Sequence, residues 1–285
     1  MEWEPEADWV ALTVGTGVSN GGVWLTPDGL VVKRLLPGVE RVDHYAYWRR
    51  QAEVASSGVV ERTVGVRGPR CVKVESDPGG VTVCSAAVSP VEFEPVELAA
   101  AVGRFGLNEF EPAEWFARRI LWDRLAKDEK GAGWASLVGE ERLPAGVRRD
   151  CGRLWERRYE LMDELDRLPQ QVVHGDAHPV NLIGREGDHV VAVDWEQFGV
   201  GPVGFDLGYL VVSTEATIDV LLGAYQSGSR STWPREAVRR GAVLTAAITV
   251  VARAAWSLTQ DEPGDHVERL CRLDQVVAEA ARQAL

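Results

Sequence analysis

The spacing of apolar residues changes near residue 88, and this change constrains the fold more than any other feature of the chain. Before it, short runs rich in β-branched residues and bounded by Gly, Pro and Asp predict β-strands. These runs are residues 10–14, 22–25, 30–33, 71–74 and 81–84. Residues 26–29, Thr-Pro-Asp-Gly, have turn chemistry and predict a hairpin between the second and third runs. The N-terminal part is therefore expected to be an antiparallel sheet, interrupted by one helical stretch at residues 43–55.

Beyond residue 95 the apolar residues recur three and four positions apart, which predicts helices. The predicted helical segments are residues 97–105, 112–126, 145–168 and most of the chain after 207. A second group of short apolar runs predicts strands at residues 171–173, 182–183 and 190–194. The fold class expected is α+β, with two lobes: a sheet with one helix over residues 1–88, and a larger, mostly helical lobe over residues 89–285.

Length and charge exclude several classes of protein. A chain of 285 residues with 45% hydrophobic residues can bury a large core without disulfides. The net charge of −12 repels a phosphate backbone, so nucleic acid is not expected as a partner. Most of that negative charge lies beyond residue 90. It has two interpretations: a soluble acidic surface, or attraction of a cationic ligand.

The cysteines and the apolar runs predict a cytoplasmic protein. The four cysteines lie far apart with no CxxC pair, which is typical of reduced thiols. The longest apolar candidate, residues 242–255, is too short to span a membrane and is broken by Arg253. The N-terminus is acidic where a signal peptide would be basic and then apolar.

Chemically unusual residues are concentrated between residues 172 and 196. Asp176, Asn181 and Asp194 lie beside short apolar runs, so a buried scaffold would hold them on loops. The oxygens of an Asn and an Asp brought together by a hairpin are ligands that Mg²⁺ prefers when phosphates complete its coordination shell. A further carboxylate, free of the metal, can accept the proton of an attacking hydroxyl. This combination is suited to phosphoryl transfer, which depends mainly on positioning and charge neutralisation.

The same region carries a family resemblance. The string HGDAHPVN at residues 174–181, then Asp194, then GPVGFDL at residues 201–207 resembles the aminoglycoside phosphotransferase and choline kinase family, of the antibiotic-kinase type. The resemblance implies a protein-kinase-like bilobal fold. It also implies that Asp176 is the catalytic aspartate and that Asn181 and Asp194 bind Mg²⁺.

The resemblance assigns supporting roles as well. His174 and Asp206 match the positions that buttress the catalytic loop from beneath. His178 lies near the phosphates or has a structural role in the loop, and the structural role is the more common one. Trp195 and Glu196 directly follow a metal ligand, so we expect them to contact the acceptor.

The N-terminal lobe is expected to bind the nucleotide. A loop at residues 15–24 contains four glycines, and its backbone N–H groups can contact phosphates, with Gly17, Ser19 and Asn20 as the candidates. Such loops are often ordinary turns, but this one precedes Lys33. A lysine on an otherwise apolar strand is costly unless it is paired. The resemblance implies that Lys33 reaches the α- and β-phosphates.

The helical partner of Lys33 has two candidates. Relatives place a Glu where this chain has Gln51, so either Glu53 makes the pair or Gln51 supplies a neutral contact. The two positions lie about 200° apart on a helix, so both cannot face the site; we favour Glu53. Between the lobes, Ala86 and Val88 are expected to contact the purine base of ATP or GTP through their backbone.

These features predict a Mg²⁺-dependent kinase that transfers the γ-phosphoryl group of ATP or GTP to a hydroxyl of a sugar-containing small molecule. The acceptor class that they favour is an antibiotic or amino sugar. The short interval from Asp194 to Asp206 leaves little room for an activation loop, which argues against a protein substrate. One alternative is a metabolite kinase of the choline, amino-sugar, homoserine or methylthioribose type. Another is a non-catalytic, pseudokinase-like nucleotide-binding module, supported by the missing Glu. The oligomeric state is not predicted.

Overall fold

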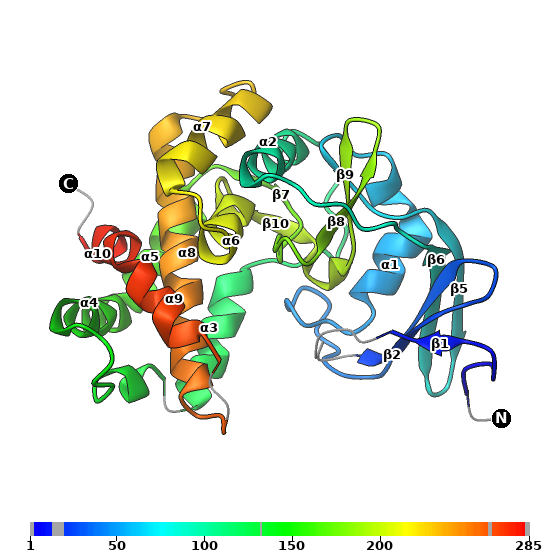
Figure 1. The fold of residues 1–285 in the computed structure, drawn as a ribbon, viewed down its shortest axis with the longest axis horizontal. Helices are drawn as coiled ribbons and strands as arrows, with labels where there is room; N and C mark the ends of the chain where they lie inside the picture. The colour runs from blue at the N-terminus through cyan, green and yellow to red at the C-terminus, as the bar shows by residue number, and fades with distance from the viewer. Residues whose placement is uncertain (1–2, 13–19, 132, 262–263, 283–285) are drawn as a thin grey trace.

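The computed structural model describes residues 3–12, 20–131, 133–261 and 264–282, and it has two lobes (Figure 1). The N-terminal lobe is a five-stranded antiparallel sheet in the order β1-β2-β3-β6-β5. Its strands are β1 (Val10–Ala11), β2 (Asn20–Leu25), β3 (Leu30–Leu35), β5 (Cys71–Asp77) and β6 (Gly80–Ala86). The strands predicted at residues 22–25, 30–33, 71–74 and 81–84 are present, and the one predicted at 10–14 is described only over Val10–Ala11, because residues 13 and 14 lie outside the described residues.

The predicted hairpin between β2 and β3 forms. The N–H of Gly29 donates to the carbonyl oxygen of Thr26 at 3.0 Å, and Gly29 has φ of +80°, a conformation in which glycine has no steric penalty. The resulting register places Lys33 between Val23 on β2 and Val83 on β6. Lys33 is therefore on a central strand of the sheet.

The helix of this lobe, α1 (Arg50–Ser57), begins seven residues later than the predicted start at residue 43. The preceding segment is taken up by turns and by a bridge between Val39 and Tyr47. Trp48 and Ala52 pack with residues of the sheet in a small hydrophobic cluster. This contact fixes α1 against the strand that carries Lys33.

The boundary between the lobes is not a single point at residue 88. Strand β4 (Val66–Arg67) pairs in parallel with β9 (His189–Ala192), which pairs antiparallel with β8 (Leu182–Glu186). A short piece of the N-terminal 88 residues thus belongs to a sheet of the C-terminal lobe. It ties the first lobe to the hairpin that leads to Asp194.

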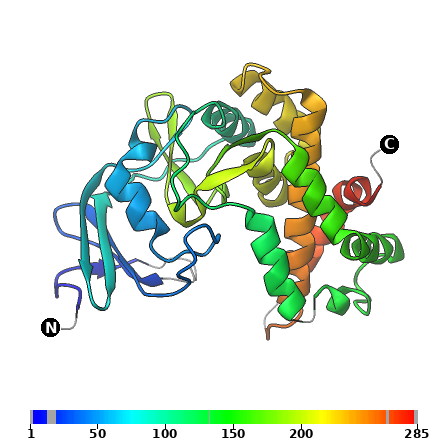
Figure 2. The same cartoon turned by 180° about the vertical axis from the view of Figure 1, so that it is seen from behind.

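The C-terminal lobe is mostly helical. Its helices are α2 (Pro95–Phe105), α3 (Ile120–Lys130), α4 (Ala145–Glu156), α5 (Arg158–Arg167), α6 (Phe205–Ser213), α7 (Ile218–Gly228), α8 (Arg235–Ser257), α9 (His266–Arg272) and α10 (Asp274–Ala281). The long helix α8 runs through the lobe and is covered by α6, α9 and α10 (Figures 1 and 2). No helix in the described part of the chain is both long and apolar enough to cross a membrane.

Two predicted helices differ from the observed ones. The segment predicted as a helix over residues 112–126 becomes helical only at Ile120, because Ala117 instead pairs with the strand β10 (Gly199–Pro202). The N–H of Ala117 donates to Phe198 O at 3.0 Å and its carbonyl accepts from Val200 N at 2.9 Å. The predicted helix 145–168 is broken at Arg157, whose φ and ψ of −98° and 9° separate α4 from α5.

The predicted second group of strands positions the polar residues. Strand β7 (Gln170–Val173) pairs antiparallel with β10, with Val173 opposite Gly199. The loop after β7 leads into the β8–β9 hairpin, where Val193 N–H donates to Asn181 O at 2.8 Å. This bond places Asn181 beside the segment that carries Asp194.

Candidate active site

The loop that carries Asp176 is supported from beneath by Asp206, in the first turn of α6. The carboxylate of Asp206 accepts the backbone N–H of His174 at 2.8 Å and of Gly175 at 3.1 Å. Gly175 has φ of +87°, and a Cβ there would lie 2.3 Å from Gln197 O, so the loop requires glycine. Burial raises the pKa of Asp206, and these N–H groups counter the effect. Asp206 therefore holds the backbone of the loop at His174 and Gly175.

The imidazole of His174 joins the loop to the neighbouring hairpin. Its Nε2 lies 3.0 Å from Val193 O and its Nδ1 accepts the N–H of Asp176 at 3.3 Å. A carbonyl oxygen can only accept, so Nε2 carries the hydrogen of the contact with Val193 O. His174 therefore couples the position of Asp176 to the strand that precedes Asp194, as its predicted role requires.

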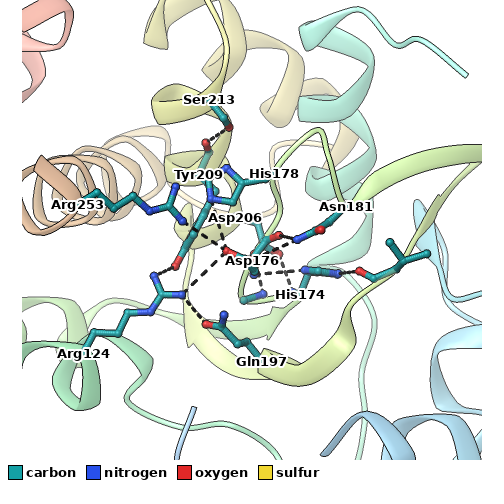
Figure 3. A network of polar contacts seen from close by, with 12 residues as sticks. Arg124, His174, Asp176, His178, Asn181, Gln197, Asp206, Tyr209, Ser213 and Arg253 are labelled. Atoms are coloured by element: carbon teal, nitrogen blue, oxygen red, sulfur yellow. Dashed lines mark hydrogen bonds and ion pairs between the residues drawn. The ribbon is translucent and has the colours of Figure 1, made fainter. Parts of the chain in front are cut away.

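The carboxylate of Asp176 is held on one side only. Asn181 Nδ2 donates to Asp176 O at 2.9 Å and to its Oδ2 at 3.0 Å. The other oxygen, Oδ1, is buried and has no hydrogen-bond partner among the described residues. Its nearest polar neighbours are His178 Nε2 at 3.5 Å, Arg253 at 3.8 Å and Arg124 at 4.0 Å (Figure 3).

The charges around Asp176 keep it ionised. Burial by itself would raise its pKa, but the surrounding His178, Arg124 and Arg253 outweigh burial, so the pKa is held below its ordinary value. Burial lowers the pKa of His178 to about 3, against the opposing effect of Asp176. His178 is therefore neutral at neutral pH, and the positive charges that lie beside Asp176 at that pH include Arg124 and Arg253.

The two arginines are held differently. Arg124, on α3, donates to the hydroxyl of Tyr209 and to Gln197 Oε1, the latter at 2.6 Å. Arg253, on α8, lies near the Tyr209 ring, 5.9 Å from its centroid, and donates no hydrogen bond within the described chain. Figure 3 shows both side chains directed at Asp176.

Lys33 has two partners. Its Nζ lies 2.7 Å from Gln51 Oε1 and 2.7 Å from Asp194 Oδ1. The preference for Glu53 as its helical partner is wrong: α1 begins at Arg50, and this register turns Gln51 toward the lysine. The neutral contact, which was the alternative, is the one observed.

Asp194 has a strained backbone. Its φ of 61° and ψ of 58° lie in the left-handed region, which is rare for a residue other than glycine. The surrounding structure holds it there: β9 ends before it, and the short 3₁₀ turn Trp195–Gln197 follows it. The carboxylate is thereby aimed at Lys33 rather than along the strand.

Arg50 connects the two lobes behind these residues. Its guanidinium group is completely buried and donates five hydrogen bonds to backbone carbonyl oxygens. The acceptors are Trp115, Tyr45, Glu196, Val42 and His44, at 2.6 to 2.9 Å. Burial lowers the pKa of Arg50 to about 10, so it remains charged. Arg50 thus fixes the start of α1, next to Gln51, against the turn that follows Asp194.

Trp195 does not face the acceptor, contrary to prediction. It is 3% exposed, donates its indole N–H to Ala192 O at 2.9 Å and packs against Phe105, Phe198 and the ring of His174. The 3₁₀ turn directs it into the core. Its neighbour Glu196 stays close to the site: burial, then the charge of Asp194, raise its pKa to about 7.

Asn181 and Asp194 fit a magnesium ion. Asn181 uses its amide nitrogen on Asp176, which leaves its oxygen available, and among the described residues Asp194 uses Oδ1 alone, on Lys33. Within the described residues no three His, Cys, Asp or Glu side chains form a metal cluster. Two protein oxygens are the usual contribution when nucleotide phosphates supply the rest of the Mg²⁺ shell.

The predicted nucleotide contacts are described in part. Gly17 and Ser19 lie outside the described residues, and only the backbone of Asn20 is described, at the start of β2. The N–H of Ala86 donates to Arg70 O at 2.9 Å, so it is not a free donor for a base as predicted. Val88, half-buried after the end of β6, remains a candidate for that contact.

Sequence reasoning missed Arg50, Arg124 and Arg253. For Arg253 a signal existed: it is the charge that breaks the apolar run 242–255, and a charge inside a buried helix needs a reason. Arg124 and Arg50 lie in amphipathic segments where an arginine is ordinary. Only the folded chain brings them to the site.

The fold is that of known small-molecule kinases. The solved structure of a choline/ethanolamine kinase family protein from Mesorhizobium loti has a TM-score of 0.62 at 18% identity, covering 95% of this chain and 88% of that chain. The GDP complex of aminoglycoside 2′-phosphotransferase-IIIa has a TM-score of 0.61 at 15% identity, covering 95% and 93%. Choline kinase LicA from Streptococcus pneumoniae has a TM-score of 0.58 at 17% identity, covering 94% of each. These similarities confirm the predicted protein-kinase-like bilobal α+β fold.

No curated protein matches this chain closely enough to count as a relative. The model of the phosphotransferase enzyme family matches residues 94–239, about half of the chain. That stretch holds the loop that carries Asp176, the β8–β9 hairpin and Asp206, which are the parts that support and surround Asp176. The chain therefore belongs to the phosphotransferase enzyme family.

Proposed function

We propose that this protein is a Mg²⁺-dependent small-molecule kinase that transfers the γ-phosphoryl group of ATP or GTP to an acceptor hydroxyl. The observation that carries the proposal is Asp176 Oδ1, a buried, ionised acceptor atom with no hydrogen-bond partner in the described chain. A hydroxyl of the acceptor would donate to it. The membership of the phosphotransferase family and the GDP bound to one structural neighbour support a nucleotide as the donor.

In this proposal each residue of the site has a separate role in the transfer. Asp176 orients the acceptor hydroxyl and takes its proton as the new oxygen–phosphorus bond forms. The bond from the γ-phosphorus to its bridging oxygen breaks, and the electron pair leaves with the nucleoside diphosphate. Asn181 and Asp194 would hold Mg²⁺, which neutralises phosphate charge, and Lys33 would bind the α- and β-phosphates.

The finer form of the proposal concerns the acceptor. A sugar-containing antibiotic is supported by the similarity to an aminoglycoside phosphotransferase, and a metabolite by the similarity to choline kinases. Ala86 O and Val88 would contact the purine base. These residues and acceptors are proposed from the sequence pattern together with the family.

A turnover assay tests the proposal. ADP release from MgATP is measured with a panel of antibiotics, amino sugars, sugar acids and choline, and nucleotide affinity is titrated with and without Mg²⁺. We expect at least one acceptor to stimulate release, and Asp194→Asn to abolish the gain in nucleotide affinity that Mg²⁺ produces. Nucleotide binding without any stimulated release would favour the pseudokinase-like module instead.

A further inference from the structure

The guanidinium groups of Arg124 and Arg253 lie beside Asp176 and indicate which class of acceptor can bind there. Building on the proposed function, we infer that Arg253, with Arg124 behind it, binds an acidic group of the acceptor, next to the hydroxyl that Asp176 takes up. The acceptor class is then a hydroxy acid, a sugar acid or a phosphorylated polyol. The polycationic amino sugars lie outside it.

Arg253 is a cation without an adequate partner. Its nearest carboxylate oxygen, Asp176 Oδ1, is 3.8 Å away, too far for a hydrogen bond, and Arg253 makes none with other described residues. Arg124 and Arg269 are like charges that act on it. Burial lowers the pKa of Arg253, yet 30% of its side chain stays exposed. A guanidinium group with five donors in this position is suited to a carboxylate or phosphate that enters from solvent.

Arg124 provides the contrast that singles out Arg253. Two of its donors are already used, on the Tyr209 hydroxyl and on Gln197, and its guanidinium lies 5.5 Å from the ring centroid of Tyr45. These contacts fix Arg124 in place as a permanent positive charge. Arg253 is the one of the two whose donors remain available to a ligand.

His178 Nε2, 3.5 Å from Asp176 Oδ1, is unsatisfied as well within the described residues. Asp176 Oδ1, His178 Nε2 and Arg269 Nε are buried atoms without hydrogen-bond partners in the described chain. His178 is only 8% exposed, and leaving such an atom unpaired costs about 1–3 kcal/mol. A ligand that brings a hydroxyl and an acidic oxygen together would satisfy Oδ1 and Arg253 at once.

The distance between the two binding groups limits the spacing on the ligand. Oδ1 and the Arg253 nitrogen are 3.8 Å apart, and each would bind an oxygen at about 2.8 Å. A hydroxyl and an acidic group on neighbouring carbon atoms are therefore close enough to reach both groups at once. This arrangement is found in α- and β-hydroxy acids and in sugar acids.

The charges near Asp176 argue against a cationic acceptor, which was one interpretation of the negative net charge. The negative balance of the C-terminal lobe allowed attraction of a cationic ligand, but charges on the surface are screened beyond about 8–10 Å. The basic side chains within 4.0 Å of Asp176 Oδ1, among the described residues, are two arginines and a neutral histidine. The local environment, rather than the total charge, determines which acceptor is favoured.

Matched acceptors and a matched variant test the inference. The kcat/KM for ADP release from MgATP is measured with glucose, glucuronate and glucosamine, and with glycerol, glycerate and glycerol 3-phosphate. We compare the wild-type chain, Arg253→Gln and Arg235→Gln. Arg235 is the exposed first residue of α8, so its variant makes the same charge change away from the site.

In the wild type we expect the kcat/KM for at least one acidic acceptor to be at least ten-fold higher than that for its neutral and amino counterparts. Arg253→Gln should remove most of that advantage by raising the KM for the acid, without changing MgATP affinity, and Arg235→Gln should retain it. A comparison of the kcat/KM for glycerate with that for glycerol 3-phosphate shows whether the site prefers a carboxylate or a phosphate.

Two outcomes would overturn the inference. Equal kcat/KM values for the acidic, neutral and amino acceptors, or turnover of neutral or amino acceptors alone, would show that Arg253 selects no acid. An equal loss of kcat for every acceptor in Arg253→Gln would instead assign the arginine to the transferred phosphoryl group. Failure of the proposed function itself differs from both, because no acceptor of the wider panel, acidic, neutral or cationic, would then stimulate ADP release.

Discussion

The two sides of the active site are built on different principles. On the donor side, formed by Lys33, Gln51 and Asp194, one lysine is shared between a carboxylate and a neutral amide at 2.7 Å each. On the acceptor side, formed by Asp176, Arg124 and Arg253, two guanidinium groups stand near one carboxylate at 3.8 to 4.0 Å without bonding to it. The donor side is closed by its own hydrogen bonds, whereas the acceptor side has unpaired groups that a ligand can complete.

The difference shows how each side can be recognised. Lys33 and Asp194 are marked by local patterns: a charge on an apolar strand and an aspartate at the end of a hairpin. The arginines come from two helices far apart in the chain, and no local pattern links them to Asp176. The chemistry common to kinases is therefore visible in the sequence, and the chemistry that selects the acceptor is not.

Removing the carboxylate on the acceptor side should have the largest effect. Asp176→Asn keeps the shape and the contact with Asn181 but removes the proton acceptor, so kcat should fall about 10³-fold. MgATP affinity should change little, because the donor side is intact. Asp188→Asn, in the exposed β8–β9 turn, is the control and should retain full activity. A variant that kept more than a tenth of the wild-type kcat would exclude Asp176 as the catalytic group.

Substitution of Arg50 tests the contact between the two lobes. Arg50→Met should destabilise the protein by about 3–5 kcal/mol, because it leaves five buried carbonyl oxygens without their donor. Arg49→Met, one residue earlier, changes a side chain whose weak contacts are to Ser76 and the Trp48 ring and should cost less than 1 kcal/mol. Urea unfolding measures both. Similar losses in the two variants would refute the proposed interlobe role of Arg50.

The acceptor side should also make the fold sensitive to acid. The pKa of His178 is about 3 in the folded chain and near 6.5 when unfolded, so the unfolded chain binds the additional proton as pH falls below 6.5. Stability should then decrease by up to about 1.4 kcal/mol per pH unit, most visibly between pH 6 and 4.5. The contribution of Asp176 is lost only at lower pH, because its folded pKa is lowered.

A substitution separates this effect from that of other groups. The loss of stability in this range should be smaller in His178→Asn than in the wild type when the free energy of unfolding is measured in urea at each pH. A pH dependence identical in both proteins would mean that His178 is not buried in its neutral form.

The smallest effect is expected on the donor side, where Gln51 and Glu53 form a matched pair. Gln51→Ala removes the contact with Lys33 and should weaken MgATP binding about three- to ten-fold, which corresponds to the net contribution of a typical hydrogen bond. Glu53→Ala should leave the affinity unchanged. Titration of both variants with AMP-PNP and Mg²⁺ gives the answer, and a larger loss in Glu53→Ala would reinstate the partner that the sequence favoured.

The sequence by itself determined the strands, the hairpin at Gly29, the catalytic loop and the family. These features depend on short-range effects: turn chemistry, strand and helix periodicity, and the positions of the polar residues within one motif. Helix starts were less certain, because α1 and α3 begin only where tertiary contacts of the preceding segment end. The register of α1 then decided between Gln51 and Glu53.

Only the tertiary structure decided what surrounds those motifs. The 3₁₀ turn after Asp194 directs Trp195 into the core, although its place in the chain favoured the acceptor pocket. The packing of α3 and α8 against the loop brings Arg124 and Arg253 to Asp176. The physical reason is that the sequence specifies the charge of a side chain but not its surroundings. Its neighbours and its burial, and therefore its contribution to the energy, arise only when distant helices pack together.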